Sequence, residues 1–407
     1  MDNQGGTGSA PPWSRYLPPL SWLKGYQPGW LGGDLIAGVT LAAYAIPVSL
    51  AYAGLAGLPP QLGIYGYLLG GLGYALFGSS RQLAVGPTSA ISLMIAASVG
   101  AMARGDAARH GEIANLAAFA VALLCLISWL LRLSGLMRLI SDSILVGFKA
   151  GAGLAIIATQ LPSLFAVQGG GRNFLQRLVL LAGELGQINH LALALGLAAI
   201  ALLLLGERLA PGRPVALFVV ILGILASSIF GLAAQGVPTT GAIPAGLPPL
   251  ALPHLQIDDL DQIFPLAAGC LLLAYIESVS AARTFAAKYG RSLDSRQEFL
   301  GLGAANLAAG LGHGFPVAGG LSQSAVNDKA GARTPLALVF ASATLALGLL
   351  FLTRPLANLP TAILAAVVVT AVYGLIDVPA LVRMWRISRI DFSAAAIALA
   401  AVLLLGI

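Results

Sequence analysis

The sequence predicts an all-α polytopic membrane protein, and three observations point to this class. Hydrophobic residues make up 58% of the 407-residue chain, while charged residues make up only 9%, against about 25% in soluble domains. Mean hydropathy is +0.87. Apolar runs of about 20 residues, the length that crosses a bilayer, recur along the chain. A surface of this composition suits lipid, and the bilayer is the first partner that we expect.

Several functional classes are disfavoured. The small basic excess, 22 Lys and Arg against 16 Asp and Glu, is typical of cytoplasmic loops in membrane proteins, so we expect no nucleic-acid partner. Cys125 and Cys270 lie inside apolar runs and the four histidines are scattered, which disfavours a disulfide framework or a metal site. No P-loop or dinucleotide fingerprint stands in a suitable context, so we expect no cofactor and no enzyme.

The expected elements follow from the apolar runs in order. Residues 1–12 are polar and glycine-rich and read as a disordered lead, and the following Trp- and Pro-containing stretch suits the membrane surface, so 1–32 forms an N-terminal polar and interfacial segment. Residues 172–187 are expected to form an interfacial helix or part of a span. Thirteen spans are predicted at about 33–55, 62–78, 83–103, 114–132, 143–165, 189–207, 213–234, 262–287, 296–312, 315–332, 334–353, 358–376 and 391–407.

Loop charges support this map with the N-terminus inside, because basic residues concentrate on the cytoplasmic side of membrane proteins. Lys149 and Arg283 lie within spans. The outer segments hold Arg104, Arg109, Arg172, Arg177 and Arg354. The inner segments hold Arg15, Lys24, Arg81, Arg132, Arg138, Arg208, Arg213, Lys288, Arg291, Arg296, Lys329, Arg333, Arg383, Arg386 and Arg389.

The Pro- and Gly-rich outer loop 235–261 marks the seam between two halves. Seven spans precede it, and an odd number inverts the second half relative to the first. The third span of each half begins with a similar interruption, LAVGPTSAISLMI at 83–95 and FPVAGGLSQSAVN at 315–327. A pair of interrupted apolar segments at matching positions is a good pointer to a transporter's binding site.

Irregular backbone survives at membrane depth only inside protein or against a water-filled cavity. A helix that begins there offers free N–H groups and about half a positive charge, so two such starts facing each other would attract an anion. Thr88 and Ser89 follow Pro87 at one start, and Ser322 and Ser324 flank Gln323 at the other. The alternative is close packing, because small residues also gather where membrane helices touch.

Glu277 lies within the span 262–287, and an ionisable residue at that depth is a functional candidate. Its carboxyl group could carry a proton with the substrate. The alternative is a structural ion pair with Lys149 or Arg283. Asp34, at the start of the first span, is expected to be a helix N-cap.

The stretches 34–94 and 275–335 resemble the sulfate permease (SulP) anion transporters, and the similarity extends over nearly the whole chain. The resemblance implies an inverted repeat of seven plus seven helices. The core domain would comprise 33–132 and 262–353, and the gate domain 133–234 and 354–407. It implies an anion between the third and tenth helices, an elevator-like movement of core against gate, a homodimer and a proton as a possible second partner. The implied substrate-binding residues are Tyr52, Thr88, Ser89, Leu321, Ser322 and Gln323, with Glu277 in coupling.

Three departures from the family pattern stand out. Many relatives have Arg where this chain has Gln323, and some carry an acid or Gln where it has Val48. The chain also ends inside the predicted span 391–407. The resemblance implies a fourteenth helix and a cytoplasmic STAS domain beyond that point, so we expect the sequence to be a membrane domain without its last helix.

The leading hypothesis is a secondary active transporter of a small anion, such as sulfate, bicarbonate or a dicarboxylate, working by proton-coupled symport or exchange. An anion channel is an alternative, because the same site would serve it. A non-transporting voltage-responsive protein is another, since prestin belongs to the same family. The family and composition suggest a bacterial inner membrane.

Overall fold

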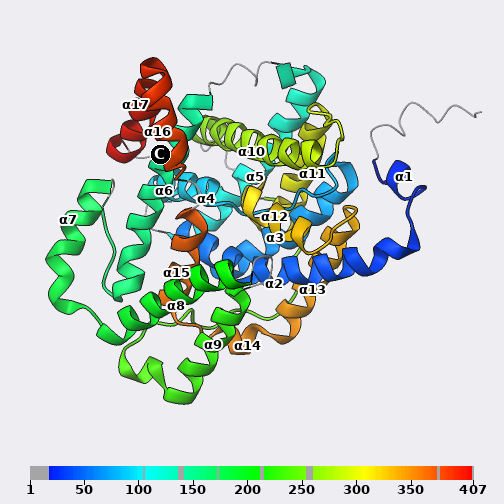
Figure 1. The fold of residues 1–407 in the computed structure, drawn as a ribbon. Helices are drawn as coiled ribbons and strands as arrows, with labels where there is room; N and C mark the ends of the chain where they lie inside the picture. Colours follow the sequence, from blue (N-terminus) through cyan, green and yellow to red (C-terminus); the bar gives the residue numbers. More distant parts are fainter. Residues whose placement is uncertain are drawn as a thin grey trace, which may run out of the picture.

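The computed structural model describes residues 18–103, 106–135, 142–171, 174–210, 215–253, 260–373 and 376–405. This part of the chain is mostly helical (Figure 1). The predicted disordered lead at 1–12 lies outside the described residues. The class expected from composition, an all-α polytopic protein, is confirmed.

The first half follows the predicted order with boundaries displaced by a few residues. Of the stretch 172–187, which the sequence left open between an interfacial helix and part of a span, the described residues 174–187 form the short helix α7 and a 3-10 turn. The elements are α1 (Pro19–Trp22), η2 (Pro28–Trp30), α2 (Leu31–Leu55), α3 (Pro60–Phe77), β1 (Val85–Gly86), α4 (Ser89–Met102), α5 (Ala107–Leu130), α6 (Asp142–Phe165), α7 (Phe174–Glu184), η4 (Leu185–Gln187), α8 (His190–Leu209), α9 (Val215–Phe230) and η5 (Leu232–Gln235).

The second half also agrees, with two additions that the sequence did not predict. The short helix α14 follows α13, and the amphipathic α16 precedes α17. The elements are α10 (Leu260–Lys288), α11 (Gln297–Leu311), β2 (Ala318–Gly319), α12 (Leu321–Lys329), α13 (Leu336–Phe351), α14 (Thr353–Leu356), α15 (Thr361–Tyr373), α16 (Val378–Ile387) and α17 (Arg389–Leu405).

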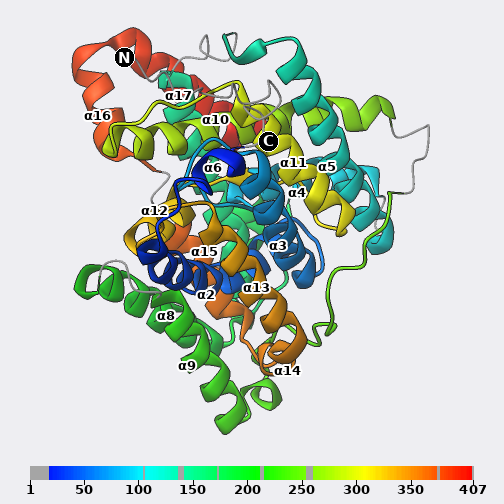
Figure 2. The same ribbon diagram turned by 90° about the vertical axis from the view of Figure 1, so that its right-hand side faces the viewer.

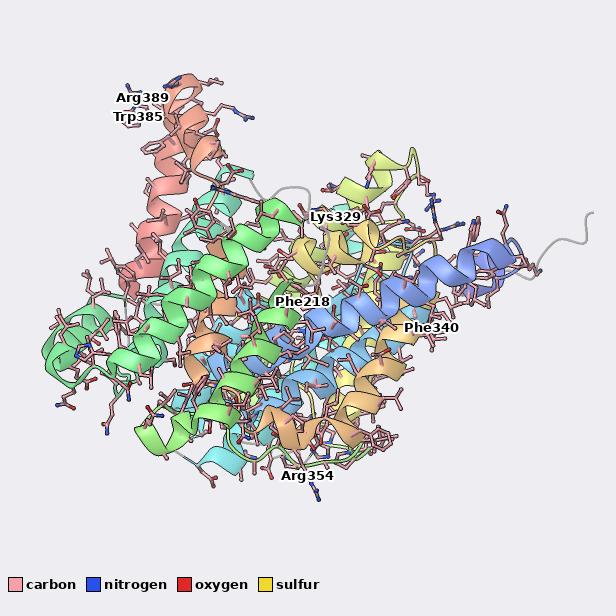
Figure 3. All side chains as sticks on the ribbon, turned by 60° about the horizontal axis from the view of Figure 1, so that its bottom comes forward. Phe218, Lys329, Phe340, Arg354, Trp385 and Arg389 are labelled. Atoms are coloured by element: carbon pink, nitrogen blue, oxygen red, sulfur yellow. The ribbon has the colours of Figure 1, made fainter. Side chains whose placement is uncertain are left out.

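Among the described residues, six helices are long and apolar enough to cross a membrane, and three apolar helices are shorter. Large apolar side chains on α8 and α9 face outward, among them Leu205, Phe218 and Ile229. Figure 3 shows Phe218 in this position, and it shows Arg354 on the opposite side of the molecule from Lys329 and Arg389. The assignment of Arg354 to the outside and of the other two to the inside stays a prediction.

Close glycine contacts join the helices of the predicted core segments. A Cβ atom on Gly73 of α3 would lie 2.4 Å from the backbone oxygen of Ala304 in α11. One on Gly38 of α2 would lie 2.6 Å from the backbone oxygen of Ala337 in α13. Because real Cβ atoms do not approach this closely, glycine is what lets these backbones touch.

Glycine also allows close contacts between helices of the predicted gate segments. A Cβ atom on Gly147 of α6 would clash with the backbone of Ala395 in α17, and one on Gly223 of α9 would meet the side chain of Ile363 in α15. Gly196 of α8 approaches Leu164 of α6 in the same way. Figure 2 shows α8 and α9 to one side of α2, α3 and α13. Glycine therefore allows close contacts within each of the two predicted groups of helices, and the division itself stays a prediction.

The expectation that Asp34 caps a helix is wrong. The N-cap of α2 is Trp30. The fully buried Asp34 carboxylate instead accepts hydrogen bonds from the backbone N–H of Arg333 at 2.6 Å, and from the N–H and hydroxyl of Thr334 at 3.0 and 2.6 Å. The residue joins α2 to the turn before α13, far away in sequence.

Candidate functional site

Two short strands, each leading into a helix, form the centre of the site. β1 and β2 pair antiparallel, with Val85 opposite Gly319 and Gly86 opposite Ala318. α4 begins at Ser89 and α12 at Leu321, within three residues of the paired strands. The N-cap of α4 is Thr88, whose side chain accepts no hydrogen bond from the first turn, and the N-cap of α12 is Gly320, which has no side chain to cap with. The amides of both helix starts therefore keep their capacity to bind a ligand.

Buried side chains satisfy the backbone of β2. The hydroxyl of Ser278 in α10 accepts from the N–H of Gly319 at 2.7 Å. The fully buried amide of Asn306 in α11 accepts from the N–H of Val317 at 2.9 Å and donates to its carbonyl at 3.0 Å. Irregular backbone is thus paired with protein at the depth where lipid offers no partner.

Two side chains of α12 form hydrogen bonds with the backbone that leads into β1. The Ser324 hydroxyl accepts from the N–H of Ala84 at 2.9 Å, and the Asn327 amide donates to the carbonyl of Gln82 at 3.0 Å. On the other side, Gly86 lies against the ring of Tyr67, where a Cβ atom would come within 2.2 Å of a ring carbon. Each broken segment is therefore fixed in part by the other.

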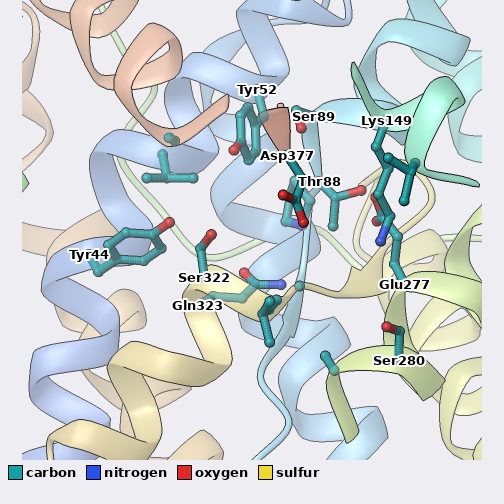
Figure 4. Close-up of a pocket in the computed structure, with 17 residues that line it drawn as sticks. Tyr44, Tyr52, Thr88, Ser89, Lys149, Glu277, Ser280, Ser322, Gln323 and Asp377 are labelled. Carbon is teal, nitrogen blue, oxygen red and sulfur yellow. The ribbon is translucent and has the colours of Figure 1, made fainter. Parts of the chain in front are cut away.

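A cavity of about 260 Å³ opens at the two helix starts and brings together the substrate-binding residues that the resemblance implies and Glu277, whereas Ser324 does not line it (Figure 4). Its walls also include Tyr44, Lys149, Ser280 and Asp377. Tyr52, Thr88, Ser89 and Gln323 are buried and Glu277 is half-buried, whereas Leu321 and Ser322 are exposed. The predicted residues in its lining are Tyr52, Thr88, Ser89, Glu277, Leu321, Ser322 and Gln323.

Some polar atoms in this cavity have no protein partner. Among the described residues, the Thr88 hydroxyl and one carboxylate oxygen of Glu277 are buried without a hydrogen bond. The Gln323 amide donates to the carbonyl of Ala318 at 3.1 Å, so it turns back onto β2. Unpaired buried polar atoms are rare in proteins and call for water or a ligand.

The charged groups come from different helices. In Figure 4 Lys149 of α6 lies next to Glu277 of α10, while Asp377, just before α16, enters from another side. Arg283, the other partner considered for Glu277, is not in the cavity lining and is exposed. Of the two cations considered as partners of Glu277, only Lys149 lines the cavity. The described salt bridges do not include a Lys149–Glu277 pair.

Sequence reasoning did not select Tyr44, Ser280 or Asp377 as site residues. Tyr44 lies two helical turns before Tyr52 on α2, which places both on one face and offered a usable signal. Asp377 is the N-cap of α16, accepting from the N–H of Ala380 at 2.9 Å. Because α16 was not expected, neither was the position of this acid.

Two further cavities lie along the same seam. One of about 390 Å³ shares Tyr44, Val48 and Ser322 with the central cavity and extends to Lys329 and Glu207. The other, also about 390 Å³, is lined by Gly54, Thr159, Arg177 and Thr361, and shares no lining residue with the central cavity. Along α6 the buried Ile156 lies between Lys149, which lines the central cavity, and Thr159, which lines this second one. Along α15 the buried Val368 lies between Ala371 and Ala365 in the same way.

Comparison with known sequences identifies the relatives. The profile of the sulfate permease family matches residues 31–398. A probable sulfate transporter of Mycobacterium tuberculosis (strain CDC 1551 / Oshkosh) is 36% identical over 392 residues, covering 96% of this chain and 70% of the relative. The chloroplastic sulfate transporter 4.1 of Arabidopsis thaliana is 32% identical over 388 residues, covering 93% of this chain and 56% of the relative. These relatives are named as transporters.

Solved structures show the same fold. The murine anion transporter Slc26a9 in its inward-facing state matches with a TM-score of 0.87 at 22% identity, covering 99% of this chain and 70% of that chain. The transmembrane domain of the cyanobacterial bicarbonate transporter BicA matches with a TM-score of 0.83 at 24% identity, covering 94% of this chain and 97% of that chain. On the strength of the profile match, which spans most of its length, the chain belongs to the sulfate permease family.

Proposed function

We propose that the protein is a secondary active transporter of a small oxyanion, with sulfate as the first candidate, and that the anion binds where α4 and α12 begin. The observation that carries the proposal is the pair of uncapped helix starts, held together by β1 and β2, at one cavity with Ser89 and Ser322. Each start contributes about half a positive charge and free amides. Sulfate is favoured because the named relatives are sulfate transporters.

The charges in the cavity support coupling to a proton. Lys149 adds one positive charge to the two helix starts, but Glu277 and Asp377 add two negative charges when ionised. A divalent anion entering beside ionised Glu277 would meet repulsion in a poorly solvated space. Protonation of this carboxyl group would relieve the repulsion, so Glu277 is our candidate for the residue that carries the proton.

The packing supports movement of one helix group against the other. The close glycine contacts described above join helices of the same group: Gly73 and Gly38 within the core, Gly147 and Gly223 within the gate. Gly54, on the face of α2 that lines the seam, has no atom within 4 Å of where its Cβ would be. A loosely packed seam between two tightly packed bodies suits an elevator-like mechanism.

The arrangement of cavities favours a transporter over a channel. The central cavity shares lining residues with one neighbour, whereas along α6 and α15 the buried Ile156 and Val368 lie between the residues that line it and those that line the other. A conducting pore needs one continuous path, and alternating access needs a site open to one side at a time. The loop charges predict that the connected side is the inner one. The homodimer and the inner-membrane location stay predictions.

Uptake into liposomes tests the function. The full chain is reconstituted, labelled sulfate is supplied outside, and uptake is followed with and without an inward proton gradient. We expect saturable uptake that unlabelled sulfate inhibits. Competition by bicarbonate and by a dicarboxylate ranks the other candidates. The proposal would be contradicted if the protein neither took up nor bound any of the three anions. Single-channel currents would indicate that the protein is a channel and not a transporter.

Replacing Glu277 by Gln tests the coupling. Glutamine keeps the size and polarity of the group but cannot exchange a proton, so uptake should persist and lose its dependence on the gradient. Glu112→Gln is the matched control, because Glu112 is exposed and pairs with Arg109 away from the cavity at 3.1 Å. Unchanged pH dependence in Glu277→Gln would remove the role assigned to this residue.

A further inference from the structure

A separate cavity of about 460 Å³ lies on the side of the core that the loop charges assign to the inside. It shares no lining residue with the central cavity. Four parts of the chain form it: α1 with the residue before it, the segment between α3 and β1, the end of α10 with the segment that follows it, and Pro335 just before α13. The polar members of the lining are Ser79, Ser80, Arg81, Gln82, Arg291 and Ser292.

Two arginines share this cavity without a counterion. None of the lining residues that the structure describes is Asp or Glu, and neither arginine takes part in a described salt bridge. Burial, and then the neighbouring charge of Arg291, lower the pKa of Arg81 from its ordinary value. Arg291 packs against the ring of Tyr289, with its guanidinium carbon 5.4 Å from the centroid. Like charges held together in this way are unfavourable unless something negative lies between them.

The nearby acids are engaged elsewhere. The buried Glu298 accepts from the Tyr74 hydroxyl at 2.9 Å and from the Ser79 hydroxyl at 2.6 Å. Asp294 caps the start of α11 by accepting from the N–H groups of Arg296 and Gln297 at 2.9 and 3.0 Å. Neither carboxylate lines the cavity. The positive charge there is thus left for a ligand.

Trp22 provides an independent indication. Its side chain lines the cavity and is only 7% exposed, and its indole N–H finds no acceptor among the described residues. A buried N–H without a partner is unfavourable, because it has given up its hydrogen bond to water. Tryptophan donates and cannot accept, so the missing partner must be an acceptor. This donor and two guanidinium groups without a described counterion line the same cavity, Arg291 as an exposed residue.

We infer that this cavity binds a phosphate-type oxyanion, either the phosphate of an anionic lipid headgroup or a soluble phosphate, through Arg81, Arg291 and the indole N–H of Trp22. Arginine forks match phosphate oxygens bidentately. A ligand there would bridge the segment that leads into β1 to the end of α10, which carries Glu277. Occupancy would therefore stiffen two of the elements that form the central site.

Binding to the purified full chain tests this. The thermal unfolding midpoint in neutral detergent is titrated with inorganic phosphate, then with short-chain phosphatidylglycerol and, as the uncharged counterpart, phosphatidylcholine. We expect phosphate or phosphatidylglycerol to raise the thermal unfolding midpoint, and phosphatidylcholine to leave the midpoint unchanged. A response to phosphatidylglycerol that exceeds the response to phosphate identifies a lipid headgroup, and the reverse order identifies a soluble ligand.

Variants separate this site from the central one, where phosphate could also bind. Arg81→Gln and Arg291→Gln should each weaken the response about tenfold or more, since each removes charge-assisted hydrogen bonds. Trp22→Phe, which keeps the ring and removes the N–H, should weaken it about fivefold. Arg208→Gln is the control, an exposed charge at the end of α8. Wild-type affinity in both cavity arginine variants, or an equal loss in Arg208→Gln, would overturn the inference.

Because the readout is unfolding, the result does not depend on transport. A protein that moved no anion could still show this binding, and a working transporter could lack it. Arg81→Lys adds a check on folding, because it keeps the charge and removes only the planar fork. It should bind more weakly than the wild type and more tightly than Arg81→Gln. Equal binding in all three would also contradict the inference.

Discussion

The side chain of Asn306 offers a sharp test of how β2 is held in place. Its amide makes hydrogen bonds of 2.9 and 3.0 Å to the N–H and carbonyl of Val317, immediately before β2, and it is fully buried. Asn306→Ala would leave both backbone groups unpaired in a space closed to water. Each such group costs about 1–3 kcal/mol, so we expect a loss of about 2–6 kcal/mol in the free energy of unfolding.

Asn358→Ala is the matched control. This substitution also removes an amide hydrogen bond, from Asn358 to the Ser228 hydroxyl at 3.1 Å, but that bond is exposed to solvent. Water can replace it, so the cost should be below about 0.5 kcal/mol.

The assay is reversible unfolding of the purified protein in mixed micelles, followed by circular dichroism. Labelled-sulfate binding to the folded fraction completes the measurement, because a displaced β2 should also weaken the anion site. The account of the site would be refuted if the free energy of unfolding of Asn306→Ala lay within about 0.5 kcal/mol of that of the wild type and the variant kept full anion affinity.

Two further substitutions test packing and charge. Gly73→Ala should lower the unfolding free energy by about 1–3 kcal/mol, because its Cβ would lie within 3 Å of backbone atoms of Ala304 and Ala305; Gly100→Ala, with no atom within 4 Å, should not destabilise. Equal effects of the two would show that α3 and α11 can separate freely. Gln323→Arg places a positive charge in the central cavity and should lower the KM for sulfate more than that for bicarbonate; an unchanged ratio would place the anion away from α12.

The positions of the spans could be predicted because apolar length is a strong signal in a membrane protein. The interruptions at 83–88 and 315–320 were also visible, since Gly and Pro break an otherwise apolar run. What the local pattern could not give was their pairing. Val85 and Gly319 are far apart in sequence, and only the folded helices bring them together.

The errors have physical causes. Asp34 has the sequence position of a capping residue, but its partners are Arg333 and Thr334, which no local rule could find. The amphipathic α16 was missed because a short helix with alternating charged and apolar residues resembles a charged loop. Asp377 therefore enters the cavity as a residue that sequence reasoning had left between two spans.

The division into core and gate, the inverted repeat and the role of each site residue stay predictions. Glycine packing gives the division a physical basis, because Gly73 and Gly147 each fix a contact within one group. Cross-linking distances measured between α2 and α15 with and without substrate would show whether the groups slide. A constant distance under all conditions would favour a rigid pore.

The central claim is that an anion binds at the starts of α4 and α12. Selenate has the shape and charge of sulfate and scatters anomalously, so diffraction from crystals grown with selenate locates it directly. The account predicts a peak in the central cavity within hydrogen-bonding distance of backbone N–H groups at 88–89 and 321–323. Selenate bound elsewhere, with apolar side chains closing the space between the two helix starts, would contradict it.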